Sequence, residues 1–262
     1  MKSFLYLISI AFFSLNALSQ ELRPYNDDLY FKVINENEMV PKVDSLKAII
    51  IVFNDLAEGN AKQSIINNPQ LKEIKLMGPS QDFIQLISGL KMDSLTHLFI
   101  EEYNGSKLIL PAFSTLEHLT IQSKNLTTLS MENASLNRLD ILDIDAPELI
   151  YWKSEKDFPN LGLIELKAPK LDYFPIEQMP NIFQFSYYCS FKNWPTNICS
   201  YQELTCVSFE NYKTINIDKC LKKKIKKGVF SNITIYDKID GQKMLEVESR
   251  DRKKFFNALD NQ

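Results

Sequence analysis

The only two histidines of the chain are the residues whose type and spacing most readily suggest chemistry. His97 and His118 occupy the third position of two similar segments, LTHLFI and LEHLTI. If these segments form neighbouring strands, the two imidazoles lie side by side, with Glu101 and Asp143 nearby. Histidines with carboxylates ligate metals or act as general acid–base groups. No candidate nucleophile accompanies them. We therefore expect no enzyme and no cofactor, and keep a metalloprotein or metal-dependent hydrolase centred on this pair as an alternative.

The four cysteines form a second group with possible chemistry, and all lie in the last third of the chain. Outside the cytoplasm, Cys189, Cys199, Cys206 and Cys220 suggest disulfides, with three possible pairings. Their spacings of 10, 7 and 14 residues match no zinc motif. The pairings to test first are Cys189–Cys206 and Cys199–Cys220, and free buried thiols are the alternative.

A repeated apolar frame must position these residues. The frame is L-x-x-L-x-L, with other apolar residues allowed at its three key positions. It occurs nine times at steps of 21 to 26 residues, starting at Leu46, Leu71, Leu95, Leu116, Leu139, Leu161, Ile182, Leu204 and Phe230. In three units a second apolar pair follows ten and thirteen residues after the first leucine, as Leu126 and Leu129 do after Leu116. Each such unit therefore has a strand and a buried return segment.

These residues resemble the leucine-rich-repeat family over roughly residues 46–236. The resemblance implies an α/β fold: a right-handed solenoid, or horseshoe, with one curved parallel β-sheet on the concave side and mostly extended convex return segments. Asn54, Asn104 and Asn125 fit the asparagine position of the family, whereas Pro147 and Pro169 occupy it in later units. A parallel β-helix with two legs per coil is the alternative fold.

Side chains alternate along a strand, so positions three, five and seven of the frame are expected to face the concave solvent. The fourth position is expected in the core, which predicts burial of Leu119, Leu142, Ile164 and Phe185. The concave face combines aromatic, histidine and carboxylate side chains that favour recognition of a protein or a glycan. The predicted binding residues are His97, Phe99, Glu101, His118, Asp143, Asp145, Glu165 and Tyr188.

The sequence divides into four regions. Residues 1–19 are typical of a cleavable signal peptide, with a basic start, an apolar run from Phe4 to Leu15, and a cut before Gln20. The run is short for a membrane span, which makes an uncleaved anchor the less favoured alternative. Residues 20–45 are expected to form an N-terminal cap, 46–236 an array of about nine coils, and 237–262 a C-terminal cap.

Two local patterns predict further elements. The segment Ser80 to Gly89 predicts a convex-side helix with Ser80 as N-cap and Gly89 as C-cap. In the C-terminal cap, Asp240-Gly241 predicts a hairpin turn, and residues 249–259 predict a short helix.

Composition narrows the class of protein. With 45% hydrophobic and 24% charged residues, the 262-residue chain is expected to be globular. A net charge of -3 argues against a nucleic-acid partner. The basic run Lys222 to Lys227 is interpreted as a solvated cap segment, with an anionic glycan or lipid site as the alternative.

The sequence as a whole predicts a binding or protein-interaction module that is secreted or periplasmic, without stable membrane insertion after signal cleavage. The signal peptide and composition resemble those of secreted Gram-negative bacterial proteins of the Bacteroidetes type. A structural component of an envelope or adhesion assembly is a further alternative.

Overall fold

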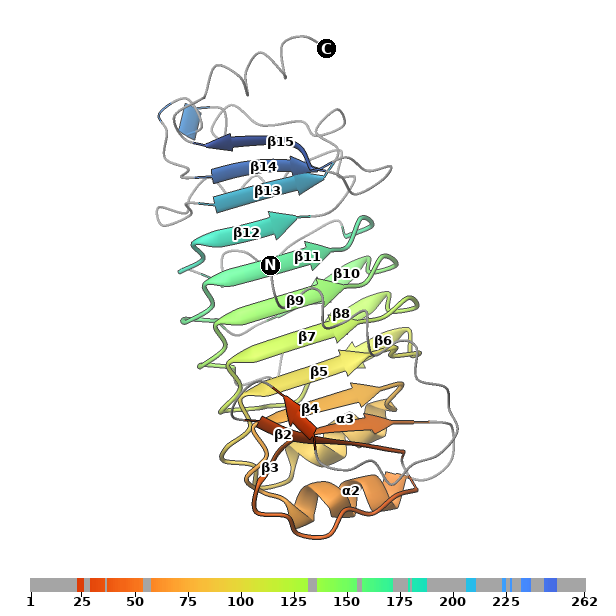
Figure 1. Cartoon of the computed structure of the whole chain (residues 1–262). Coiled ribbons are helices and arrows are strands. Elements are labelled where there is room, and N and C mark those ends of the chain that lie inside the picture. The colour runs from red at the N-terminus through yellow and green to blue at the C-terminus, as the bar shows by residue number, and fades with distance from the viewer. Residues whose placement is uncertain are drawn as a thin grey trace.

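The computed structural model shows an α/β protein dominated by one large, mostly parallel β-sheet (Figure 1). It describes residues 23–25, 29–35, 37–53, 58–131, 136–154, 157–171, 179, 181–187, 206–210, 223–224, 227, 232–236 and 243–248. In these residues the main sheet has twelve strands that follow one another in chain order. They are β1 (Arg23–Tyr25), β2 (Leu29–Asn35), β3 (Leu46–Val52), β4 (Glu73–Met77), β5 (His97–Glu101), β7 (His118–Gln122), β9 (Ile141–Asp145), β11 (Leu163–Lys167), β12 (Gln184–Tyr187), β13 (Cys206–Glu210), β14 (Asn232–Tyr236) and β15 (Lys243–Glu248).

Each repeat of the apolar frame contains one strand of the main sheet. Neighbouring strands pair in parallel from β2 to β14, and equal frame positions lie opposite one another: His97 pairs with His118, and His118 with Ile141. The chain therefore advances by one strand per unit, as a solenoid-like arrangement requires. The predicted parallel sheet and its register are confirmed.

The main sheet extends beyond the predicted array, and an antiparallel pair of strands closes each end. Strand β2 lies before Leu46 and pairs in parallel with β3, while β1 pairs antiparallel with β2. At the other end, β14 and β15 pair antiparallel on either side of the predicted Asp240-Gly241 turn. The turn itself, residues 1–19 and the helix predicted at 249–259 lie outside the described residues.

The return segments carry a second, smaller sheet in the middle of the described chain. Strands β6 (Lys107–Ile109), β8 (Thr128–Ser130) and β10 (Tyr151–Lys153) pair in parallel, with β8 in the centre. Strands β8 and β10 contain Leu129 and Trp152, the second residues of the apolar pairs recognised after Leu116 and Leu139, whereas no such pair was recognised at β6. Their central residues Leu108, Leu129 and Trp152 are buried. The middle coils thus have a parallel strand on both legs.

Two helices occupy return segments near the N-terminal end, α2 (Glu58–Asn67) and α3 (Gln81–Ser88). The predicted N-cap of α3 is confirmed, because the Ser80 hydroxyl accepts a hydrogen bond from the Phe83 amide at 3.0 Å. Gly89 is the C-cap, as predicted, but its φ of −79° lies in the right-handed region. The left-handed freedom of glycine is used instead at Gly78, whose φ is 74°. In the described residues no helix is long and apolar enough to cross a membrane.

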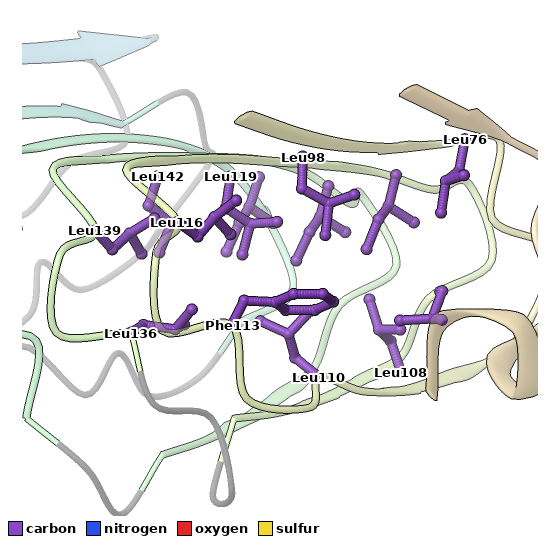
Figure 2. Close-up of a cluster of buried hydrophobic side chains, with 14 of the residues drawn as sticks. Leu76, Leu98, Leu108, Leu110, Phe113, Leu116, Leu119, Leu136, Leu139 and Leu142 are labelled. Carbon is purple, nitrogen blue, oxygen red and sulfur yellow. The ribbon is translucent and has the colours of Figure 1, made fainter. Parts of the chain in front are cut away.

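The core lies between the main sheet and the return segments. Figure 2 shows two rows of side chains that face each other: Leu76, Leu98, Leu119 and Leu142 from the sheet, and Leu108, Leu110, Phe113 and Leu136 from the return segments. The four predicted core residues Leu119, Leu142, Ile164 and Phe185 are each 0% exposed. The frame position assigned to the core is therefore confirmed.

Candidate functional site

The candidate site lies on the face of the main sheet that points away from the core, which we call the open face. It is formed by positions three, five and seven of the repeat frame. On β5, β9 and β11 these positions are half-buried, alternating with fully buried ones. The sequence predicted solvent-facing side chains here. The extra burial arises because parallel strands lie about 4.8 Å apart, so that equal positions pack against one another.

His97 and His118 lie side by side on this face, as the register predicted. Their ring centroids are 5.4 Å apart with an interplanar angle of 63°, an edge-to-face contact. The Phe99 ring contacts His118 in a similar geometry, at 5.5 Å between centroids. Nδ1 of His97 lies 2.8 Å from the Thr96 hydroxyl oxygen. The two imidazoles and one phenyl ring therefore form a compact aromatic group on β5 and β7.

Burial keeps both imidazoles neutral near pH 7. Burial, together with the neighbouring His97, lowers the pKa of His118 to about 4. Burial also lowers the pKa of His97, although the Glu117 carboxylate partly opposes that shift. At neutral pH the pair therefore offers neutral hydrogen-bonding groups and no positive charge.

Glu101 does not accompany the histidines as the sequence suggested. It lies at the opposite end of β5 from His97, roughly 13 Å along the strand. There its carboxylate forms an ion pair with the Lys75 ammonium, at 2.7 Å between Oε2 and Nζ. The Glu101 side chain is only 14% exposed and the Lys75 side chain 13%. Among the described residues, no group of three His, Cys, Asp or Glu side chains is arranged to hold a metal ion.

Asp143, in the centre of β9, is the least well accommodated charged residue of the open face. Burial and, to a lesser extent, the nearby carboxylates of Glu165, Asp145 and Glu101 raise its pKa to about 7, against the opposing effect of Lys167. In the described structure, Oδ1 of Asp143 is buried without a hydrogen-bond partner. An unsatisfied buried acceptor costs about 1–3 kcal/mol.

The other acidic residues of β9 and β11 share one cation. The Lys167 ammonium lies 3.6 Å from an Asp145 oxygen and 3.8 Å from a Glu165 oxygen. On β4, the pKa of Glu73 is raised to about 7, because the effect of burial outweighs the opposing effect of Lys75. The predicted binding residues did not include Glu73, Lys75 or Lys167, although their frame positions place them on the same face.

A hollow of about 390 Å³ opens where β5, β7 and β9 begin. It is lined by His97, Glu117, His118, Arg138, Asp140, Ile141 and Asn160. Arg138 and Glu117 form an ion pair inside it. Only the two histidines of this set were predicted as site residues. Glu117 and Asp140 occupy the second frame position, and Arg138 and Asn160 precede the frame, so these four fall outside the alternation used for the prediction. Ile141 occupies the third position but is apolar.

An exposed aromatic residue lies close to Asp140, one of the residues that line the hollow. Phe183 precedes β12, and its side chain is packed against Gly162 of the preceding coil. A Cβ atom on Gly162 would lie only 2.3 Å from the Phe183 ring and 3.1 Å from Oδ1 of Asp140. Glycine is therefore required for this close approach. Phe183 is nevertheless 46% exposed.

Several predicted site residues cannot be placed. Tyr188, Cys189, Cys199 and Cys220 lie outside the described residues, and Cys206 is described only as a backbone position of β13, opposite Gln184. The disulfide pairings therefore stay predictions.

Part of the basic run is described. Lys223 and Lys227 are exposed, whereas Lys224 is half-buried, and burial lowers its pKa.

Comparison with protein-family models, with curated proteins and with solved structures gives no match to this chain.

Proposed function

We propose that this chain is an extracytoplasmic recognition module that binds a protein or glycan along the open face of its main sheet. The proposal includes a leucine-rich-repeat horseshoe, with the open face as its concave side. The nine-fold frame and the parallel chain-order sheet support this interpretation. The signal-like residues 1–19 support export, with a mature chain that begins at Gln20.

The observation that carries the proposal is the state of Asp143. Its carboxyl group is desolvated, surrounded by other carboxylates, and left with a buried oxygen that has no partner in the described structure. Such an arrangement lowers the stability of the folded chain. Unsatisfied buried polar groups are uncommon in folded proteins, and functional sites are where they are tolerated. A ligand that donates a hydrogen bond to Asp143 would remove this penalty.

The surroundings of Asp143 suit recognition. The half-buried Phe99 ring presents an aromatic group two strands away, and the carboxylates of Asp145 and Glu165 lie on the same face. An aromatic group with hydrogen-bonding neighbours is a common composition for the centre of a binding surface. The charged side chains also make association sensitive to salt.

Affinity capture from an extracytoplasmic extract tests the proposal. The bait is the chain from Gln20 onward, compared with the double variant Phe99→Ala and Asp143→Asn. A matched control neutralises Lys223, Lys224 and Lys227 as glutamines. We expect a reproducible partner to be lost from the open-face variant and retained by the lysine control, while circular dichroism shows both variants folded.

The reverse pattern contradicts the proposal. If the partner is retained by the open-face variant and lost from the lysine control, the basic run is the binding site. If both variants capture the partner as well as the wild-type chain does, the binding surface lies elsewhere.

A further inference from the structure

The hollow at the start of β5, β7 and β9 offers both hydrogen-bond donors and acceptors. The Arg138 guanidinium is a donor, and the carboxylates of Asp140 and Glu117 are acceptors. One ring nitrogen of each neutral imidazole contacts a threonine hydroxyl, and the other can donate or accept according to the tautomer. Ile141 adds an apolar side chain to the same lining. This mixture suits a polar, uncharged ligand with many hydroxyl groups better than an apolar one.

The charges in the hollow nearly cancel. Arg138 and Glu117 neutralise each other in their ion pair, and both histidines are neutral at pH 7. Asp140 then contributes the one unpaired charge among the lining residues, and its carboxylate has no ion-pair partner in the described part of the chain. A lone carboxylate accepts two hydrogen bonds from neighbouring hydroxyl groups of one ligand.

Phe183 supplies a flat apolar surface close to Asp140, one of the residues that line the hollow. The ring and the Asp140 carboxylate both lie close to the space that a Cβ atom on Gly162 would take. Backbone hydrogen bonds fix this arrangement: the Phe183 amide donates to the Gly162 carbonyl, and the Gly162 amide to the Asp140 carbonyl, each at 3.0 Å. The backbone that carries the ring is therefore fixed relative to Gly162, while Phe183 is 46% exposed.

We propose that the hollow binds one sugar unit of a neutral glycan, with Asp140 and Arg138 bonded to its hydroxyl groups and Phe183 packed against its carbon–hydrogen face. The volume of about 390 Å³ lies within the range of small-molecule sites. This inference rests on the proposed recognition function and narrows its ligand to a glycan. The site extends the open face, because His97 and His118 belong to both.

Saturation-transfer NMR with defined oligosaccharides tests the assignment. The probes are neutral tetrasaccharides of α-linked glucose, β-linked glucose, β-linked N-acetylglucosamine and α-linked mannose. The protein is the chain from Gln20 onward, with Phe183→Ala and Asp140→Asn as single variants. Tyr151→Ala is the matched control, since Tyr151 is 52% exposed but lies on β10 of the second sheet.

We expect at least one tetrasaccharide to bind the wild-type chain, with an affinity at least about tenfold lower in each hollow variant and unchanged in the Tyr151 control. Melting temperatures verify that the variants are folded. Gly162→Ala provides a second route: its new Cβ displaces the Phe183 ring, so binding falls although every group that contacts the sugar is retained.

Two outcomes overturn the inference: none of the tetrasaccharides binds the wild-type chain, or one binds equally well to the wild type, Phe183→Ala and Asp140→Asn. The proposed function is tested separately. If the Phe99 and Asp143 double variant loses a captured protein while no sugar binds, recognition by the open face stands and the glycan assignment falls. If capture also fails to depend on those residues, both fall.

Discussion

At the scale of single residues, Asp143 determines much of the expected pH dependence of the open face. Burial and neighbouring carboxylates raise its pKa from 3.8 to about 7. The folded chain therefore retains a proton that the unfolded chain has released, and stability falls as the pH rises through this window. Glu73, whose pKa is also raised to about 7 by burial, contributes in the same direction.

The substitution Asp143→Asn is expected to raise the unfolding free energy by about 1–3 kcal/mol near pH 8, because it removes a desolvated negative charge. Near pH 4, where wild-type Asp143 holds its proton, the variant and the wild type are expected to differ little. Urea unfolding at several pH values measures both. Asp93→Asn is the control, since the Asp93 side chain is 78% exposed. An unfolding free energy with the same pH dependence in Asp143→Asn and wild type would contradict this account.

His118 is expected to act in the opposite direction. Its pKa is lowered to about 4, so the unfolded chain gains a proton below about pH 6.5 while the folded chain remains neutral. Its contribution to stability is therefore lost as the pH falls from about 6.5 to 4. An NMR titration of the ring protons should give a midpoint near 4 for His118, which shifts upward in His97→Ala because that change removes both a repulsive neighbour and part of the burial. A His118 midpoint at or above 6.5 would show that the ring is well solvated.

At the scale of elements, the strands of the main sheet separate a core face from the open face. Leu142→Ala on β9 is expected to cost about 2–5 kcal/mol, because it leaves a cavity in the core. Leu163→Ala on the adjacent β11 makes the same chemical change at a half-buried open-face position, so its cost should be clearly smaller. Chemical denaturation compares the two directly, and equal costs would mean that the two faces are wrongly assigned.

The N-cap of α3 gives a second prediction at this scale. Ser80→Ala removes the hydrogen bond from the Phe83 amide and should cost about 0.5–2 kcal/mol. Ser88→Ala is the matched control, because its exposed hydroxyl bonds only the Gln85 carbonyl, and surface changes usually stay within about 0.5 kcal/mol. Thermal unfolding of both variants measures the difference. Equal destabilisation by the two changes would mean that the Ser80 cap contributes nothing.

The strands and the core were predictable because the same frame recurs. A recurring apolar position, such as that of Leu119 and Leu142, fixes both the register and the buried face. The contact between His97 and His118 followed from the same register. The ion pair of Glu101 with Lys75 did not, because it joins different frame positions of neighbouring strands.

The hollow was not predictable from the frame. Arg138 and Asn160 precede their strands, at positions where polar residues are tolerated and carry no periodic signal. Phe183 occupies a position where the preceding coil has Gly162, and only the three-dimensional packing shows that the ring needs this glycine. The second sheet was also missed as a sheet, although its buried residues Leu129 and Trp152 were recognised as part of a repeated pattern.

At the scale of the whole molecule, stacking of similar units builds a long surface from short strands. Each unit contributes positions three, five and seven to the open face, and the parallel register aligns them across neighbouring units. The aromatic group on β5 and β7, Asp143 on β9 and the hollow beside them come from consecutive units. The three features therefore lie on one continuous stretch of the sheet.

Carboxyl footprinting tests the central claim most directly. The chain from Gln20 onward is labelled with a carbodiimide and an amine, with and without its captured partner, and mass spectrometry measures labelling at each carboxylate. We predict that bound partner reduces labelling of Asp140, Asp145 and Glu165, while Asp44 and Asp93, whose side chains are 88% and 78% exposed, stay unchanged. Unchanged labelling of the open-face carboxylates Asp145 and Glu165 in the bound state would contradict the claim that this face is the binding surface.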